Sequence, residues 1–146
     1  MNFKKILCPT DFSDYSRAAL EMAAALARES DAELILLHAA DTPMSYAADD
    51  VEMEEDKALQ EIQKRLDQVA IAVAPSRVRR LLAEGDPGAA IVDVARDESA
   101  DLIVISTHGR SGWSRLLMGS TAEYVVRNAG CPVLSLRSSE GGPTPA

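Results

Sequence analysis

One stretch of this 146-residue chain brings together glycines, hydroxyl side chains and cations in an order suited to holding a phosphate group. The stretch opens with Ser106–Gly109, continues through the nine residues 110–118, and closes with Gly119–Thr121, where a helix is predicted to begin. A helix amino terminus carries unpaired backbone N–H groups and about half a positive charge, which together attract an anion. Glycine allows the backbone to approach that anion closely or to adopt a positive φ. The stretch therefore predicts a phosphate site whose main donors belong to the backbone.

The charge of this stretch is opposite to that of the whole chain. The chain has 15 Lys and Arg against 23 Asp and Glu, which gives a formal net charge of −8 at pH 7. No carboxylate occurs between Leu102 and Ala122, whereas Arg110, Arg115 and His108 can supply positive charge there. Because the overall negative field repels nucleic acid and anionic membrane surfaces, we predict neither as a partner. An anionic ligand would have to be held by a local site of this kind.

Other interpretations of the same residues need no ligand. Ser120 and Glu123 match the S-x-x-E pattern of a capping box, in which the serine hydroxyl accepts a hydrogen bond from the helix backbone. Glycines are also residues that ordinary turns use. Asp11, which follows the first strand-like segment, could cap the first helix or form a turn with Ser13. These alternatives stand beside the phosphate-site interpretation.

Five strand-like segments alternate with four helical patterns, and no internal repeat or linker interrupts them. The segments 34–37 and 102–105 are continuous apolar runs, which are typical of parallel strands covered on both faces. The expected strands are 4–8, 32–39, 78–83, 102–105 and 132–137. The first expected helix begins at Ser13, the second follows the apolar spacing from Leu59 to Val73, the third begins at Asp86-Pro87, and the fourth covers 121–128. This alternation predicts an α/β fold: one doubly wound, five-stranded parallel sheet with four helices on its two faces.

The expected sheet places the phosphate-binding stretch where such folds bind ligands. In open α/β sheets the ligand lies at the carboxyl ends of the strands, where the strand order reverses. Residues 106–119 directly follow the fourth expected strand. The third expected strand carries Arg77, Arg79 and Arg80, and such charges are typical of an edge strand.

Composition restricts the class of protein. A chain of this length forms one domain, expected over residues 1–137, with a disordered Gly/Pro-rich tail over 138–146. No apolar run approaches the length of about 20 residues that a membrane span needs, and no signal peptide is evident, so we expect a cytoplasmic protein. Cys8 and Cys131 lie in apolar segments and are expected to be buried thiols. His38 is expected to be a hydrogen-bonded structural histidine, and the two histidines form no transition-metal signature.

The chain resembles the universal stress protein family over about residues 3–137. The resemblance lies in four segments that occur in the family's order: 5–13 (KILCPTDFS), 36–39 (LLHA), 84–87 (EGDP), and 107–134, from THGRSG to CPVL. ATP-binding members of the family have the pattern G-x-x-G, nine residues, G-[S/T]. Gly109, the nine-residue gap and Gly119-Ser120 match this pattern, whereas Ser106 stands in place of the first glycine.

The resemblance implies the strand order 3-2-1-4-5, with ATP in the cleft between the loops after strands one and four. It implies that adenine lies against the backbone of Ala39, and that Asp11 and the Pro9-Thr10 backbone lie near adenine and ribose. It also implies a triphosphate, with Mg²⁺ or Mn²⁺, surrounded by the residues Gly109, Arg110, Gly119, Ser120 and Thr121. The hydroxyl of Ser106, in place of the first glycine, could still face the ribose or a phosphate.

Binding is better supported by the sequence than turnover. The chain has no G-x-x-x-x-G-K-[S/T] loop and no kinase motif. We therefore expect a nucleotide-responsive stress protein that acts on an unknown downstream protein; the alternatives are a nucleotide-free interaction module and a slow ATP hydrolase. The last strand contains an uncharged edge, Val133-Leu134-Ser135-Leu136, which predicts a symmetric homodimer, as the family resemblance also suggests.

Overall fold

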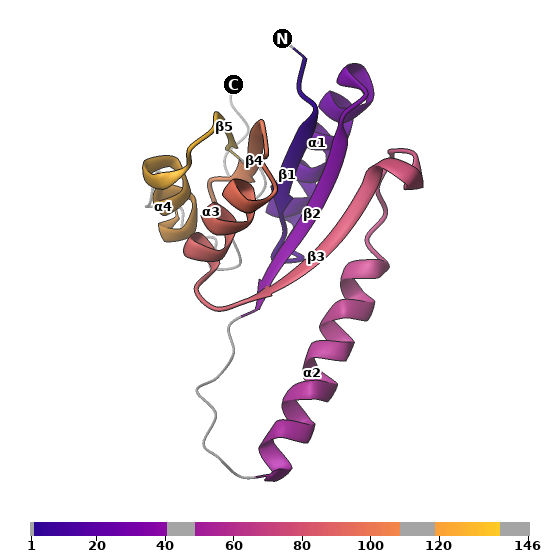
Figure 1. Ribbon diagram of the computed structural model, residues 1–146, viewed down its shortest axis with the longest axis vertical. Coiled ribbons are helices and arrows are strands. Elements are labelled where there is room, and N and C mark those ends of the chain that lie inside the picture. The colour runs from indigo at the N-terminus through magenta and orange to yellow at the C-terminus, as the bar shows by residue number, and fades with distance from the viewer. Residues whose placement is uncertain (1, 41–48, 109–118, 138–146) are drawn as a thin grey trace, which may run out of the picture.

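A computed structural model describes residues 2–40, 49–108 and 119–137 of the chain. Within these ranges strands and helices alternate (Figure 1). The elements are β1 (Lys5–Pro9), α1 (Asp14–Ser30), β2 (Glu33–Ala40), α2 (Asp49–Asp67), β3 (Val78–Glu84), α3 (Pro87–Asp97), β4 (Leu102–Ser106), α4 (Ser120–Asn128) and β5 (Val133–Leu136), with a short 3-10 turn at Pro75–Arg77 before β3. The expected tail at 138–146 lies outside the described residues.

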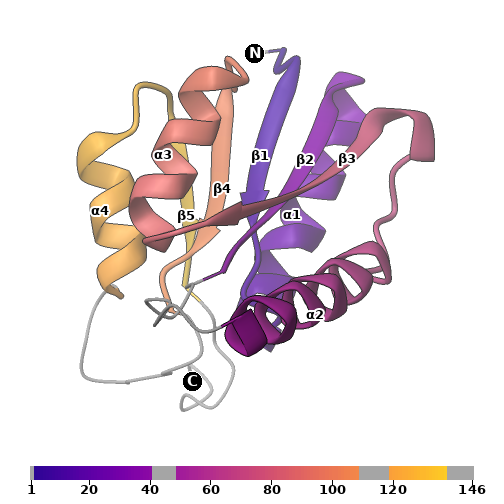
Figure 2. The same ribbon diagram turned by 60° about the horizontal axis from the view of Figure 1, so that its bottom comes forward.

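The five strands form one sheet in the order β3-β2-β1-β4-β5, and every neighbouring pair is parallel. The predicted fold class and the strand order implied by the family resemblance are both confirmed. Helices α1 and α2 cover one face of the sheet, and α3 and α4 cover the other (Figure 2). The strand order reverses between β1 and β4. The loops that follow these two strands therefore lead to opposite faces of the sheet and leave a space between them at the carboxyl ends of the strands.

The central strands β1, β2 and β4 are apolar on both sides because each faces two helical layers. Leu34 and Leu36 of β2 point into the core under α1 and α2, whereas Ile35 and Leu37 point into the core under α3 and α4. This alternation follows from the two-residue period of a strand. It explains why the central strands are continuous apolar runs instead of alternating ones.

The predicted starts of α1 and α3 are confirmed at the level of single hydrogen bonds. The Ser13 hydroxyl accepts from the backbone N–H of Ser16, and the Asp86 carboxylate accepts from that of Ala89. Pro87 occupies the first turn of α3, where its missing N–H would have no helical partner in any case. A row of alanines on α1, including Ala19, Ala23 and Ala27, is fully buried and lets the helix lie close to the sheet.

The end of the second helix differs from the expectation. The apolar spacing predicted a helix through Val73, but α2 ends at Asp67 and the chain continues as a loop. The guanidinium of Arg80 donates to the carbonyl oxygen of Leu66 in the last turn of α2 and to that of Val69 in the loop, which ties the end of the helix to β3. Val73 is still buried, so the apolar periodicity continues because the loop covers the same face of the sheet.

Both edge strands are where they were expected. At the β3 edge, Arg79 forms two hydrogen bonds with Glu98, of 2.6 and 3.1 Å, and a third of 3.2 Å with Glu33. These hydrogen bonds hold the pKa of the Glu98 carboxyl below its usual value and raise the pKa of Arg79. At the other edge, all four residues of β5 are half-buried. Among the described residues, no helix is both long enough and apolar enough to cross a bilayer.

Candidate functional site

A cleft of about 580 Å³ opens at the carboxyl ends of β1 and β4, where the strand order reverses. Its lining includes every residue that the sequence assigned to the nucleotide and that the structure describes: Pro9, Thr10, Asp11, Ala39, Ser106, Gly119, Ser120 and Thr121. These residues come from four separate parts of the chain. The other two predicted residues, Gly109 and Arg110, lie outside the described residues.

Thr10 fixes the wall of the cleft that follows β1. Its backbone N–H donates to the carbonyl oxygen of Leu37 over 2.8 Å, and its hydroxyl accepts from the N–H of Phe12 over 3.0 Å. The same hydroxyl lies 3.1 Å from that of Ser16, and the carbonyl oxygen of Thr10 lies 2.7 Å from Nδ1 of His38. A carbonyl only accepts, so this contact requires the proton on Nδ1. His38 is therefore hydrogen-bonded, as the sequence analysis expected.

Asp11 forms a turn with Ser13, which is one of the two roles that the sequence allowed for it without a ligand; the other was to cap the first helix. Its Oδ1 accepts from the backbone N–H of Ser13 over 3.0 Å, and Ser13 itself caps α1. Asp11 is therefore not the helix cap. The turn fixes the position of the carboxylate on the cleft wall, where it is the one Asp or Glu among the described lining residues. Phe12, next in the chain, adopts a φ of 66°, which is uncommon for a residue with a side chain.

The wall that follows β4 is held by hydroxyl groups. The Ser106 hydroxyl accepts from the backbone N–H of His108 over 3.3 Å, so this serine shapes the start of the loop. Both the backbone N–H and the hydroxyl of Thr107 donate to the carbonyl oxygen of Leu136, over 2.9 and 3.1 Å. The ring of His108 lies 6.0 Å from that of Tyr15 in an edge-on contact, which joins this wall to α1.

Gly119 brings the amino terminus of α4 against the end of β4. Its N–H donates to the carbonyl oxygen of Thr107 over 2.6 Å. A Cβ added to Gly119 would lie 3.2 Å from that oxygen, closer than ordinary contact. The glycine thus permits a close approach of α4 to the end of β4. The positive φ that the sequence analysis allowed for Gly119 is not adopted, since its φ is −68°, and the approach to a phosphate stays a prediction.

The capping-box interpretation of Ser120 is wrong. Gly119 is the N-cap of α4 and no side chain caps the helix, so Ser120 is already the first helical residue. Glu123 pairs instead with Arg127, over 2.8 Å along the exposed surface of the helix. The helix begins one residue earlier than expected because the bond between Gly119 and Thr107 fixes its start.

The cleft has an apolar part that the sequence analysis did not assign. Ile62 of α2, Pro87 and Ile91 of α3, and Ile105 of β4 line it together with the small side chains of Ala39 and Ala40. Ser16 and His38 are also part of the lining and were not predicted as site residues. In the sequence, Ile62 and Ile91 were indistinguishable from other core-facing helix positions. The cleft therefore combines an apolar region with hydroxyl groups and a helix amino terminus.

Metal and thiol chemistry have little support in the described residues. No group of three or more His, Cys, Asp or Glu side chains in residues 2–40, 55–108 and 119–137 is placed to hold a metal ion. Cys8 is buried and Cys131 is half-buried, and both are free thiols. Burial raises the pKa of the Cys8 thiol to about 12 and also raises that of Cys131. Neither thiol is therefore activated as a nucleophile.

The sequence model of the universal stress protein family matches residues 2–137 of the chain. A universal stress protein of Methanocaldococcus jannaschii is 33% identical over 92% of this chain and 82% of its own length. A universal stress protein of Thermus aquaticus is 37% identical over 92% of this chain and 99% of its own length.

Solved structures show the same likeness. The universal stress protein UspA from Lactobacillus plantarum superposes with a TM-score of 0.74 at 28% identity, covering 94% of this chain and 99% of that one. A universal stress protein crystallised in complex with cAMP superposes with a TM-score of 0.65 at 25% identity, covering 93% of this chain and 98% of the other.

Proposed function

The protein belongs to the universal stress protein family, and we propose that its cleft between the loops after β1 and β4 binds an adenine nucleotide, with ATP as the first candidate. One observation carries the proposal. Residues from four distant segments, which the sequence and its family resemblance assign to a nucleotide, line one cleft where the strand order reverses. The complex of a related structure with cAMP supports an adenine nucleotide as the class of ligand.

The end of β2 offers donors and acceptors that suit adenine. In a parallel strand the N–H and C=O of one residue point toward one neighbouring strand, and those of the next residue point toward the other. The carbonyl of Leu37 faces β1, because it accepts from Thr10. The backbone groups of Ala39, two residues later, therefore face the same side, beyond the last residue of β1 that pairs with β2. An adenine edge has an acceptor, N1, beside the N6 donor, which complements this N–H and C=O.

The opposite end of the cleft suits phosphates. Ser120 and Thr121 form the first turn of α4, whose free N–H groups and positive dipole end favour an anion. Because the Ser120 hydroxyl does not cap the helix, it can donate to a phosphate oxygen. Gly109 and Arg110 complete this set in the proposal on the strength of the sequence pattern.

Mg²⁺ or Mn²⁺ would be held mainly by the nucleotide. Mg²⁺ binds proteins through one or two carboxylates together with substrate phosphates. The described lining offers one carboxylate, Asp11, which fits such a shared site and does not fit an all-protein metal site. When bound, the ion would neutralise phosphate charge, while Asp11 and the hydroxyl groups orient the sugar and phosphates.

We infer a binding protein that acts through a partner and not an efficient enzyme. Asp11 is held in a turn by Ser13, and the described lining contains no second carboxylate to position a water molecule. Nucleotide occupancy would alter the surface around the segment 106–120 and so change how a downstream protein binds. We propose a cytoplasmic location for this activity.

The identity of the bound nucleotide tests the proposal. Freshly purified protein is denatured, and the released small molecules are separated by ion-exchange chromatography, with the base identified by mass spectrometry. We expect an adenine nucleotide from the wild-type protein and much less from Asp11→Ala. Absence of any nucleotide, together with no heat on titration with ATP and Mg²⁺, would instead favour a nucleotide-free interaction module. Phosphate release that Asp11→Ala abolishes would favour a slow hydrolase.

The edge strand β5 supports a further part of the proposal, a symmetric homodimer. Val133–Leu136 carries no charge and is half-buried in the single chain, so apolar surface and backbone groups remain accessible along this edge. Pairing with a second copy would cover them. Sedimentation equilibrium at micromolar concentration should give the mass of a dimer, and a monomer would contradict this assembly.

A further inference from the structure

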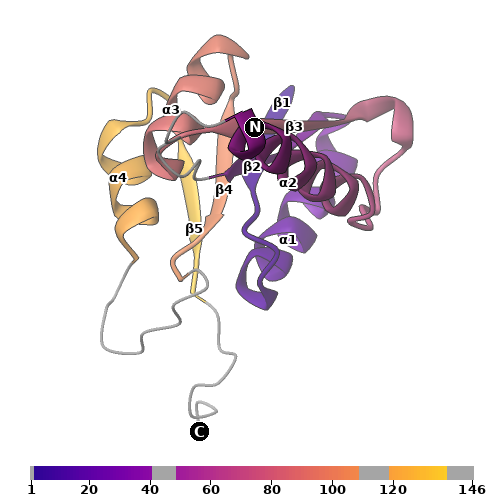
Figure 3. The same ribbon diagram turned by 90° about the horizontal axis from the view of Figure 1, so that it is seen from below.

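A second and larger hollow, of about 780 Å³, lies between α1 and the end of α2. These two helices cover the same face of the sheet (Figure 3). The hollow is lined by residues of α1, of the end of α2 and of the loop after α2. We call it the arginine groove. Its lining includes Arg17, Leu20, Ala24 and Arg28 of α1, Arg65 of α2, and Ile71 of the loop.

The three arginines of the groove have no carboxylate partner among the described residues. Arg28 donates to the carbonyl oxygen of Ala72 over 2.8 Å, and the guanidinium of Arg65 lies 4.4 Å from the centroid of the Phe12 ring. The side chain of Arg17 is exposed and makes no ion pair within residues 2–40, 55–108 and 119–137.

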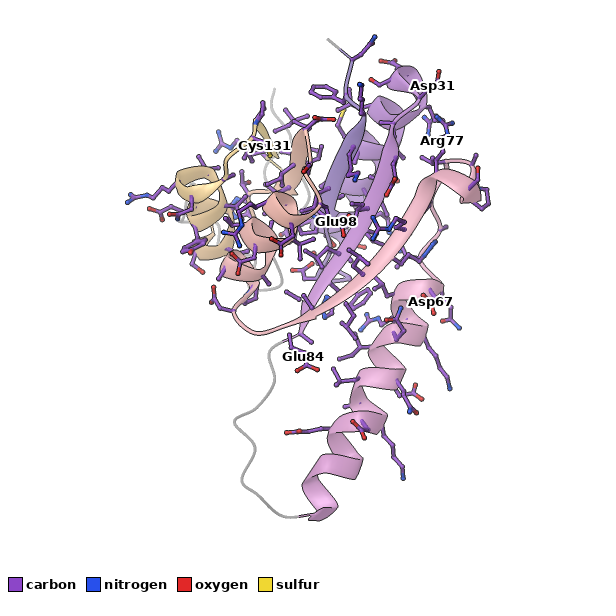
Figure 4. The ribbon with its side chains drawn as sticks, viewed as in Figure 1. Asp31, Asp67, Arg77, Glu84, Glu98 and Cys131 are labelled. Carbon is purple, nitrogen blue, oxygen red and sulfur yellow. The ribbon has the colours of Figure 1, made fainter. Side chains whose placement is uncertain are left out.

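Of the six other arginines in the described chain, four are paired with acids, whereas Arg80 donates to backbone carbonyl oxygens and Arg137 is exposed without an ion pair. Arg77 pairs with Asp31 over 3.2 Å, where the turn before β3 lies beside the end of α1 (Figure 4). The arginines at positions 79, 96 and 127 also form ion pairs. In a chain of net charge −8, the groove therefore concentrates cations that have no acidic partner within the described part of the chain. Glu21 is the one carboxylate among the described lining residues.

The floor of the groove is apolar. Leu20 and Ala24 are buried in the core beneath it, and the partly buried side chains of Phe12, Val69 and Ile71 pack against that core. A ligand that fills the groove must therefore offer apolar groups to the floor as well as negative charge to the arginines. This combination disfavours a purely hydrophilic polyanion, because such a ligand would leave the apolar floor of the groove in contact with water or with polar groups.

The length of the groove fits a peptide. Arg17 and Arg28 are eleven residues apart on α1, which is about 16 Å along the helix axis at 1.5 Å per residue. About five residues of extended chain span that distance. We propose that the arginine groove binds an acidic peptide segment of a partner protein, with carboxylates at its two ends and apolar side chains between them.

The groove adjoins the nucleotide cleft. Thr10 and Ser16, whose hydroxyl groups lie 3.1 Å apart, line both cavities and form their common wall. A peptide in the groove would thus lie next to the segment that carries Asp11. Peptide binding itself requires no nucleotide, so it can be tested independently of the function proposed above.

The test uses fluorescence anisotropy with a labelled peptide, Glu-Glu-Leu-Ala-Leu-Glu-Glu, and a second peptide with Lys in place of every Glu. Arg17→Glu reverses a charge inside the groove. Arg96→Glu makes the same change on the exposed surface of α3, on the other face of the sheet, and serves as the matched control. Glu21→Lys replaces the carboxylate of the groove by a cation and should therefore have the opposite effect on peptide affinity to Arg17→Glu. Urea melts confirm that each variant is folded.

We expect saturable binding of the acidic peptide and none of the lysine peptide. Arg17→Glu should weaken binding about tenfold, because a charged hydrogen bond is lost and a repulsion is added. Glu21→Lys should tighten it, whereas Arg96→Glu and the nucleotide-site variant Gly119→Val should change it less than about twofold. The inference is overturned by no saturation up to about 1 mM peptide, by equal effects of Arg17→Glu and Arg96→Glu, or by tighter binding of a single-stranded oligonucleotide at the same groove.

Discussion

Gly119→Val tests how closely the amino terminus of α4 must approach β4 to form the nucleotide site. The Cβ of any residue at this position would lie 3.2 Å from the carbonyl oxygen of Thr107, and valine adds two methyl groups beyond it. The backbone can accept valine, since the φ and ψ of Gly119 are −68° and 161°. The perturbation is therefore steric and acts where β4 meets α4.

The size of the effect follows from that contact. Overpacking of this kind costs about 1–3 kcal/mol in the free energy of unfolding. If relief of the contact moves the first turn of α4 away from the phosphates, each charged hydrogen bond lost weakens ATP binding by about 1.5–3 kcal/mol, or about tenfold or more. We expect Gly119→Val to remain folded and to bind ATP about 10- to 100-fold more weakly than the wild type.

Isothermal titration calorimetry with ATP and Mg²⁺ measures the affinity, and urea unfolding measures the stability. Gly130→Val is the matched control, because a Cβ at Gly130 meets no atom within 4 Å and this position lies before β5. It should change stability by less than about 0.5 kcal/mol and leave ATP affinity unchanged. A folded Gly119→Val protein with wild-type affinity for ATP would refute the link between this close approach and the nucleotide site.

Three further predictions concern the body of the protein. Leu66→Ala should lower the free energy of unfolding by about 2–5 kcal/mol in urea melts, because this side chain is fully buried and holds α2 on the sheet; a loss below about 1 kcal/mol would contradict that role. Glu98, whose pKa is lowered by Arg79, should stabilise the fold above its ordinary pKa of 4.5 and lose that effect as the pH falls through its lower folded value. The stability difference between wild type and Glu98→Gln should therefore shrink as the pH is lowered below 4.5, and a constant difference would exclude this linkage. In the native protein at about pH 8, a thiol reagent should modify Cys131 slowly and Cys8 only after unfolding, because burial raises the pKa of Cys8 to about 12; rapid modification of Cys8 would argue against its burial.

The sequence was sufficient for the elements and the fold class because their signals are local, whereas the strand order was implied by the family resemblance. Continuous apolar runs mark strands covered on two faces, and Ser13 and Asp86 mark helix starts through hydrogen bonds to residues three positions later. The cleft could be anticipated because the topology brings the ends of β1 and β4 together wherever the order reverses.

The errors arose where distant contacts override local patterns. The helix at Ser120 starts one residue early because Gly119 bonds to Thr107, and α2 stops at Asp67 although the apolar spacing continues to Val73. The loop beyond α2 covers the same sheet face that a longer helix would have covered, so hydrophobic periodicity could not distinguish the two.

The contacts of single side chains across the cleft and groove were also beyond the reach of the sequence. The contact of His38 with Thr10 joins residues 28 positions apart. Arg17 and Arg65 meet at one groove only because α1 and the end of α2 lie on the same face. Each of these residues is unremarkable in its own segment, and its role depends on the packing of two elements.

A crystal structure of the protein grown with ATP and Mg²⁺ tests the nucleotide site most directly. We expect one nucleotide per chain, with the adenine edge against the backbone of Ala39, the sugar near Asp11, and the phosphates at the first turn of α4. A cleft that stays empty at saturating ATP, or a nucleotide bound at another place on the chain, would contradict the proposed function.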